Sequence, residues 1–161
     1  MIGIDPGLSG AVAWLGLNGG AHSVDMPTIQ LTKTGFVKRA IDLNGLKILL
    51  DGYAASVSPA PVVFLERVNA FPGQGVGSMF SLGMSFWGAA GVVAGIGLEL
   101  RLVEPRDWKG HFKLNADKEL ARGLASRLFP QVDLSRKKDH GRAEALLIAR
   151  YGNDLLKQTV S

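Results

Sequence analysis

Four acidic residues occupy positions where a carboxylate is unusual. Asp5 and Glu66 each end a short, strongly apolar segment, and Asp139 and Glu144 lie at the start of an apolar segment near the C-terminus. A buried carboxylate is unfavourable unless it is paired or bound to a metal ion. Carboxylate oxygens are the ligands that suit Mg²⁺ or Mn²⁺. Four of them would hold two such ions, a pair that hydrolyses phosphodiesters without a nucleophilic side chain.

Each acid also has an ordinary structural explanation. Asp5 would cap the turn after its strand, and Glu66 would pair with the arginine that follows it. Asp139 would act as a helix N-cap, and Glu144 would compensate the helix dipole. A separation of five residues places two side chains on different faces of a helix. Asp139 and Glu144 therefore converge only if Asp139 precedes the helical part, which Gly141 permits.

The elements that position these acids are predicted from the hydrophobic pattern. Strands are expected at 1–5, 11–17, 22–25, 62–65 and 99–103, and helices at 43–57, 78–95, 117–128 and 142–156. This order predicts one α/β domain over residues 1–161, with a mixed five-stranded sheet flanked by helices on both faces. Because sites in such sheets form at the carboxyl ends of strands, Asp5 and Glu66 converge if their strands are neighbours.

Charge and composition narrow the possible partners. The chain lacks cysteine, which excludes disulfides, thiolate zinc sites and cysteine nucleophiles. Residues 101–142 hold 11 Lys/Arg against 6 Asp/Glu, whereas the rest of the chain holds 7 against 8. Such a basic region favours a polyanionic partner, with an ordinary solvated surface as the alternative. The candidate phosphate contacts are Lys109, Lys113, Arg136, Lys137, Lys138 and Arg142.

Residues 68–98 contain no charge, and 79–98 are long enough to span a bilayer. The stretch is rich in glycine and lies between segments that carry the acids. We therefore expect a buried helix that also supports a homodimer, and no membrane.

The glycine-rich loop at 69–77 directly follows Glu66. Phe71 would either stack on a base or fill the core, and Gly73 and Gln74 are candidate DNA contacts. The loop lacks both the Lys-Ser/Thr of a phosphate loop and the dinucleotide-binding spacing, so no nucleotide cofactor is expected.

Four segments together resemble the RuvC resolvases, which have an RNase H-like fold. Residues 2–7 (IGIDPG) resemble their opening strand and 64–66 (FLE) their second acidic strand. Residues 117–119 (DKE) are similar to their basic segment, and 142–146 (RAEAL) to their terminal acidic helix. The bacterial pattern has a second acid three residues before the last one, where this chain has Gly141. The Asp139–Glu144 spacing is more similar to the plant chloroplast resolvases and to related phage or bacterial proteins.

The resemblance implies a homodimeric endonuclease that resolves four-way DNA junctions by symmetric cuts. It implies Mg²⁺, with Mn²⁺ as a possible substitute, at two ions per site. It suggests Lys118 as a basic residue near the scissile phosphate, and it leaves His140 as an alternative to Asp139 in the metal site. The alternatives are a nuclease acting on RNA or an RNA–DNA hybrid, and a junction-binding protein without catalysis. The expected location is the cytoplasm of a bacterium or phage host, with an organelle matrix as the alternative.

Overall fold

Short apolar strands form the centre of the structure, a computed structural model that describes residues 1–31, 38–69 and 72–160. Strand β1 (Ile2–Asp5) pairs antiparallel with β2 (Ala11–Leu15) and parallel with β6 (Val63–Glu66). The strands β3 (Ala21–Asp25) and β7 (Leu100–Val103) complete the sheet in the order β3-β2-β1-β6-β7. The predicted mixed five-stranded sheet is confirmed.

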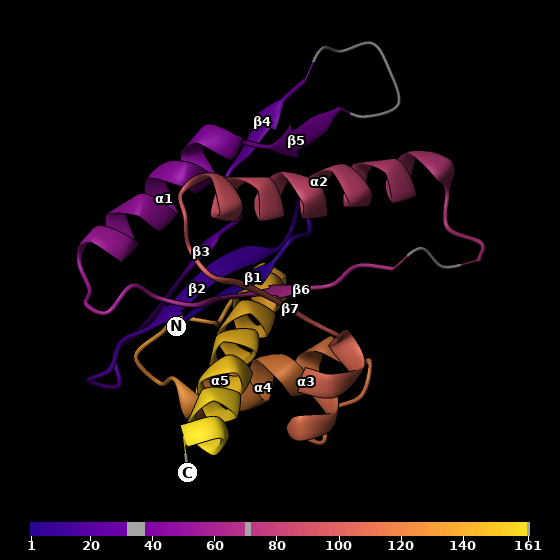
Figure 1. Cartoon of the computed structure of the whole chain (residues 1–161). Helices are drawn as coiled ribbons and strands as arrows, with labels where there is room; N and C mark the ends of the chain where they lie inside the picture. Colours follow the sequence, from indigo (N-terminus) through magenta and orange to yellow (C-terminus); the bar gives the residue numbers. More distant parts are fainter. Residues whose placement is uncertain (32–37, 70–71, 161) are drawn as a thin grey trace.

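Helices cover both faces of this sheet, as predicted (Figure 1). The helices are α1 (Leu43–Ala55), α2 (Val76–Gly95), α3 (Pro105–His111), α4 (Lys118–Leu128), the 3₁₀ helix η1 (Lys137–Asp139) and α5 (His140–Val160). One core lies between the sheet and the pair α1 and α2. A second core lies on the opposite face, where α5 crosses the sheet beside α3 and α4.

The alternation of side chains along β1 and β6 decides which layer the acids meet. The two isoleucines of β1 belong to the core under α1 and α2, whereas Gly3 lies against α5. Because successive strand residues point to opposite faces, Asp5 shares the α5 face with Gly3. The same alternation places Glu66 on the α5 face together with Phe64. Both strand-end acids therefore face the helix that carries Glu144.

Three features were not predicted from the sequence. They are a separate hairpin that pairs β4 (Thr28–Gln30) with β5 (Arg39–Ile41), the helix α3 that follows β7, and the 3₁₀ helix η1. Each hairpin strand has three residues, too few to give a period-two pattern. Helix α3 has seven residues and only one fully buried side chain, Trp108, so its hydrophobic period is equally short.

The bounds of the predicted helices also shift. Helix α1 starts after its N-cap Asp42, as predicted, but ends at Ala55. Helix α2 begins at Val76, two residues earlier than expected, and α5 extends the predicted 142–156 to 140–160.

Helix α2 is only half buried, which corrects the expectation of a buried helix. Ser85, Phe86 and Val93 lie in the core, whereas Phe80 and Trp87 are 62% and 70% exposed. Within the described residues, α2 is the one helix long and apolar enough to cross a bilayer by length and composition. Its buried face packs into the core under α1 and α2.

Gly3 tests how closely α5 must lie on the sheet. A Cβ added at Gly3 would lie 2.2 Å from the carbonyl oxygen of Ala145, on the backbone of α5. We expect Gly3→Ala to lower the free energy of unfolding by about 3 kcal/mol, because overpacking here displaces a whole helix. Urea denaturation measures the change. Gly52→Ala is the matched control, because no atom lies within 4 Å of that added Cβ. It should raise stability by about 0.5–1 kcal/mol, and equal effects of the two changes would contradict the account.

Candidate active site

Asp5 ends β1 on the α5 face and is held by the turn that follows. The backbone N–H of Gly7 donates a 3.1 Å hydrogen bond to its Oδ1. Burial raises the pKa of Asp5 to about 6, and repulsion from Glu144 adds to this rise. The hydrogen bond from Gly7 and the charges of Lys118 and Lys109 oppose the rise. Two acids and two lysines therefore gather at this strand end.

Glu66 ends the neighbouring parallel strand. The indole Nε1 of Trp108, on α3, donates a 2.8 Å hydrogen bond to its Oε1. Burial raises the pKa of Glu66 to about 7, and repulsion from Asp5 contributes next, while the Trp108 bond opposes both. Trp108 itself is fully buried. Its contact with Glu66 was not predicted.

Glu144 completes the acidic group from the second turn of α5. Glu144 is 7% exposed, and its Oε1 lies 3.5 Å from Nζ of Lys109. The same Nζ lies 5.1 Å from the ring centroid of Trp108, a cation–π distance. Lys109, predicted as a phosphate contact, thus lies inside the acidic site. Helix α3, which carries Lys109, was not predicted from the sequence. Its only indication was a proline shortly after a strand, because proline is common at the first position of a helix.

The start of α5 lies against the turn between β1 and β2. A Cβ added at Gly141 would lie 2.4 Å from the carbonyl oxygen of Ser9, and one added at Gly10 would lie 2.2 Å from the carbonyl oxygen of Asp5. Gly141 stands where the bacterial resolvase pattern has an acid. The departure from that pattern has a steric reason, because this close contact leaves no room for a side chain.

Asp139 lies apart from the other three acids and instead contacts arginines. Its fully buried carboxylate accepts hydrogen bonds from the backbone N and Nε of Arg136, both 2.9 Å, and its Oδ1 lies 3.9 Å from Nε of Arg142. Burial would raise the pKa of Asp139, but the hydrogen bonds from Arg136 outweigh it and hold the pKa below its usual value. Asp139 therefore stabilises the start of η1 from position N3 of a capping box whose N-cap is Arg136, and it is not itself the N-cap that the structural alternative expected.

His140, the alternative ligand, connects to α4. Its Nε2 lies 3.3 Å from Oε1 of Glu119, and its buried Nδ1 has no hydrogen-bond partner within the described part of the chain. Lys118 is the first residue of α4, after the N-cap Asp117, and its charge lowers the pKa of Asp5. The suggested place of Lys118 near the scissile phosphate stays a prediction.

The remaining predicted DNA contacts are dispersed over the surface. Arg136 and Arg142 form ion pairs with Asp139 and Asp25. Lys113, Lys137, Lys138 and Gly73 are exposed, and Gln74 lines a groove beside the start of α2. Phe71 lies outside the described residues.

The donor set of Asp5, Glu66 and Glu144 fits a divalent cation in kind. All the donors are carboxylate oxygens, and two of the three have raised pKa values, because burial and mutual repulsion disfavour their charged forms. As the side chains stand, no three His, Asp or Glu residues among those described are close enough to form a metal cluster. Lys109 occupies part of the space by pairing with Glu144.

Comparison with known proteins places this arrangement in context. No family model matches the sequence. The chloroplast Holliday junction resolvase MOC1 of Chlamydomonas reinhardtii is 29% identical over 126 residues, which cover 71% of this chain and 14% of that protein. The chain therefore spans a small part of the length of this relative.

Two solved structures of RuvC from Thermus thermophilus share the fold. The RuvC complex with a Holliday junction substrate aligns with a TM-score of 0.65 at 13% identity, over 98% of this chain and 94% of RuvC. A second RuvC structure aligns with a TM-score of 0.63 at 14% identity, over 98% and 95%. The chain therefore has the RNase H-like fold of RuvC, and its resemblance to the RuvC-like Holliday junction resolvases is confirmed in sequence and structure.

Proposed function

We propose that residues 1–161 form one nuclease domain that cleaves four-way DNA junctions in a metal-dependent reaction. The observation that carries the proposal is the convergence of Asp5, Glu66 and Glu144 on the face of the sheet that α5 covers. The names of the relatives, a chloroplast Holliday junction resolvase and RuvC bound to a junction, support the same substrate.

Asp5, Glu66 and Glu144 would hold the metal ions in this proposal. When bound, two Mg²⁺ or Mn²⁺ ions would activate a water and stabilise the leaving 3′ oxygen. The three carboxylates would bind these ions, and Trp108 would orient Glu66 through its 2.8 Å hydrogen bond. Asp139 would fix the start of α5 through Arg136, which keeps Glu144 in place without a metal contact.

Two lysines would position the scissile phosphate. The charges of Lys109, on α3, and Lys118, on α4, both lower the pKa of Asp5. A phosphate bound at the carboxylates would therefore lie between these two cations. Ammonium groups bind phosphate as point charges. Lys113, Lys137 and Lys138 would hold more distant parts of the DNA backbone.

Helix α2 supports the proposed homodimer. Phe80, Met84 and Trp87 are 62%, 43% and 70% exposed and share one face of the helix by their spacing. Gly91 and Gly95 continue this face, and a Cβ added to either would meet no atom within 4 Å. An apolar stripe on one helix can pack against its own copy across a two-fold axis, which would fix two active sites at a set distance.

The cellular location stays a prediction. The chloroplast relative supports an organelle matrix.

Substitution of the acids separates catalysis from binding. Asp5→Asn, Glu66→Gln and Glu144→Gln should each reduce junction cleavage below about 1% of wild type, because each removes a metal ligand. Junction affinity, measured by fluorescence anisotropy in EDTA, should change little.

Lys118→Ala should slow cleavage more than it weakens binding. Asp139→Asn is the matched control and should keep substantial cleavage while folded. If Asp139→Asn lost all cleavage while folded, Asp139 would have to be counted among the metal ligands.

The raised pKa values predict a pH-dependent stability difference in metal-free protein. The pKa of Glu66 is about 7 in the folded state against 4.5 as the ordinary value, so its contribution is full below pH 4.5 and is lost as pH rises through 7. Relative to wild type, Glu66→Gln should therefore gain about 2–3 kcal/mol in stability between pH 5 and pH 8. Urea denaturation in EDTA measures this gain. Mg²⁺ at pH 8 should then stabilise wild type but not the variant. If the stability difference between Glu66→Gln and wild type did not change with pH, Glu66 would not be a buried carboxylate repelled by its neighbours.

Charge on the α2 face should dissociate the dimer. Trp87→Glu should convert a dimer to a monomer in sedimentation velocity, because a carboxylate would be buried in an apolar contact. Leu17→Glu is the control, since Leu17 is also apolar and 89% exposed but lies between β2 and β3. A monomeric wild type, or a dimeric Trp87→Glu protein, would exclude this interface.

A further inference from the structure

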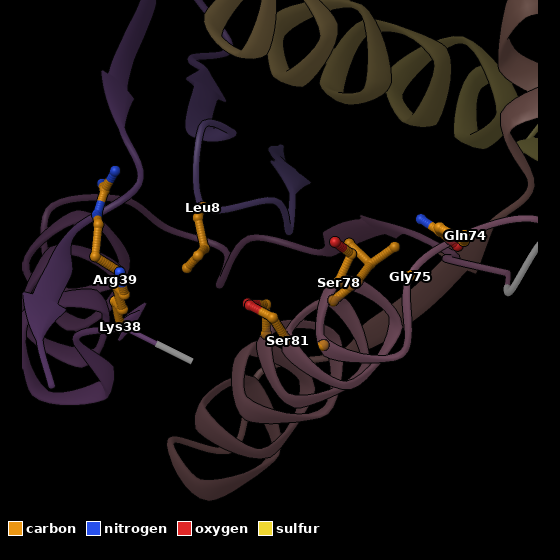
Figure 2. A pocket seen from close by; sticks show the side chains of 10 residues that line it. Leu8, Lys38, Arg39, Gln74, Gly75, Ser78 and Ser81 are labelled. Carbon is orange, nitrogen blue, oxygen red and sulfur yellow. The ribbon is translucent and has the colours of Figure 1, made fainter. Parts of the chain in front are cut away.

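A groove of about 600 Å³ separates the start of α2 from the β4–β5 hairpin. Lys38 and Arg39, at the beginning of β5, form one wall, and Ser78, Ser81 and Ser85 of α2 form the other. Leu8, from the turn between β1 and β2, lies between them (Figure 2). The predicted DNA contact Gln74 also lines this groove, whereas the acids Asp5, Glu66 and Glu144 do not.

The lining has the chemistry of a phosphate-binding surface. Two cationic residues and three serines line the space, and no acidic residue is among the described residues that line it. One of the two, Arg39, also donates a 2.9 Å hydrogen bond from Nη2 to Oγ1 of Thr28. The serines are spaced by three and four residues, which places their hydroxyls along one face of α2. Arg and Ser side chains are common donors to DNA phosphates.

The start of α2 adds backbone donors to the serine wall. Gly75 caps α2 without a side-chain hydrogen bond, so the first N–H groups of the helix have no side-chain partner from the described residues. Helix N-termini of this kind favour an anionic ligand.

The turn between β1 and β2 connects the groove with the acidic site along the chain. Leu8 lines the groove and packs against the core under α1 and α2, whereas Gly7, the residue before it, donates to the carboxylate of Asp5.

We propose that this groove binds the sugar–phosphate backbone of one DNA strand where it passes from one duplex arm to the next at the junction centre. Its volume is that of a pocket for one small ligand, which suits one or two nucleotides rather than a duplex. Basic grooves of this kind bind single strands through their phosphates. The inference rests on the proposed function, because a branched substrate is one in which a strand leaves its duplex arm at a fixed point.

Binding of a 12-nucleotide oligothymidine, measured by fluorescence anisotropy in EDTA, tests the groove without catalysis. The double variant Lys38→Gln/Arg39→Gln should bind at least fivefold more weakly. Its slope of log affinity against log salt should fall by about 1.4, since two phosphate contacts are lost. Ser81→Trp should weaken binding similarly while leaving the charge unchanged, because it fills the groove.

Lys47→Gln/Arg127→Gln removes the same two charges from α1 and α4, outside the groove, and should leave affinity within twofold of wild type. Equal losses in both double variants, or normal binding by Ser81→Trp, would overturn the groove proposal. Circular dichroism confirms that each variant is folded. Junction cleavage by wild type in Mg²⁺ is measured separately. If wild type cleaves the junction but the groove variants bind normally, only the groove proposal is rejected. If the groove variants bind weakly but wild type does not cleave, only the nuclease proposal is rejected.

Discussion

Helix α5 crosses β1 at a distance that only glycine permits, and the geometry of the acidic site depends on this contact. Gly3 on the strand leaves space for the backbone of α5, and Gly141 on the helix leaves space for the turn between β1 and β2. This approach brings Glu144, in the second turn of α5, to the strand end that carries Asp5. A larger residue at either glycine would separate the two carboxylates.

Electrostatic repulsion is the consequence of that proximity. Asp5, Glu66 and Glu144 are brought together in a partly buried space, where two of their pKa values rise to about 6 and about 7. The fold opposes this repulsion only in part, through Trp108 and Lys109. A site that gathers like charges without neutralising them is suited to divalent cations and to a phosphate held by the neighbouring lysines.

The sequence predicted the sheet and three members of the acidic site because those features have a period. Asp5 and Glu66 end apolar strands, and Glu144 lies in a helix whose apolar positions repeat every three to four residues. The role of Asp139 was not settled by spacing, because its orientation depends on Arg136 and on the short helix η1. Helix α3 and the β4–β5 hairpin were missed because elements of three to seven residues give no pattern, and Trp108, Lys109 and the groove depend on them.

The measurement that tests the central claim most directly is cleavage of an end-labelled four-way DNA junction, with Mg²⁺ and with EDTA, beside a matched linear duplex and an RNA–DNA hybrid. The account predicts symmetric nicks in the junction with Mg²⁺ only, and no cleavage of the other two substrates. Cleavage of the hybrid in place of the junction would indicate a ribonuclease, and tight junction binding without any cleavage would indicate a DNA-binding protein. Either result would contradict the proposed resolvase.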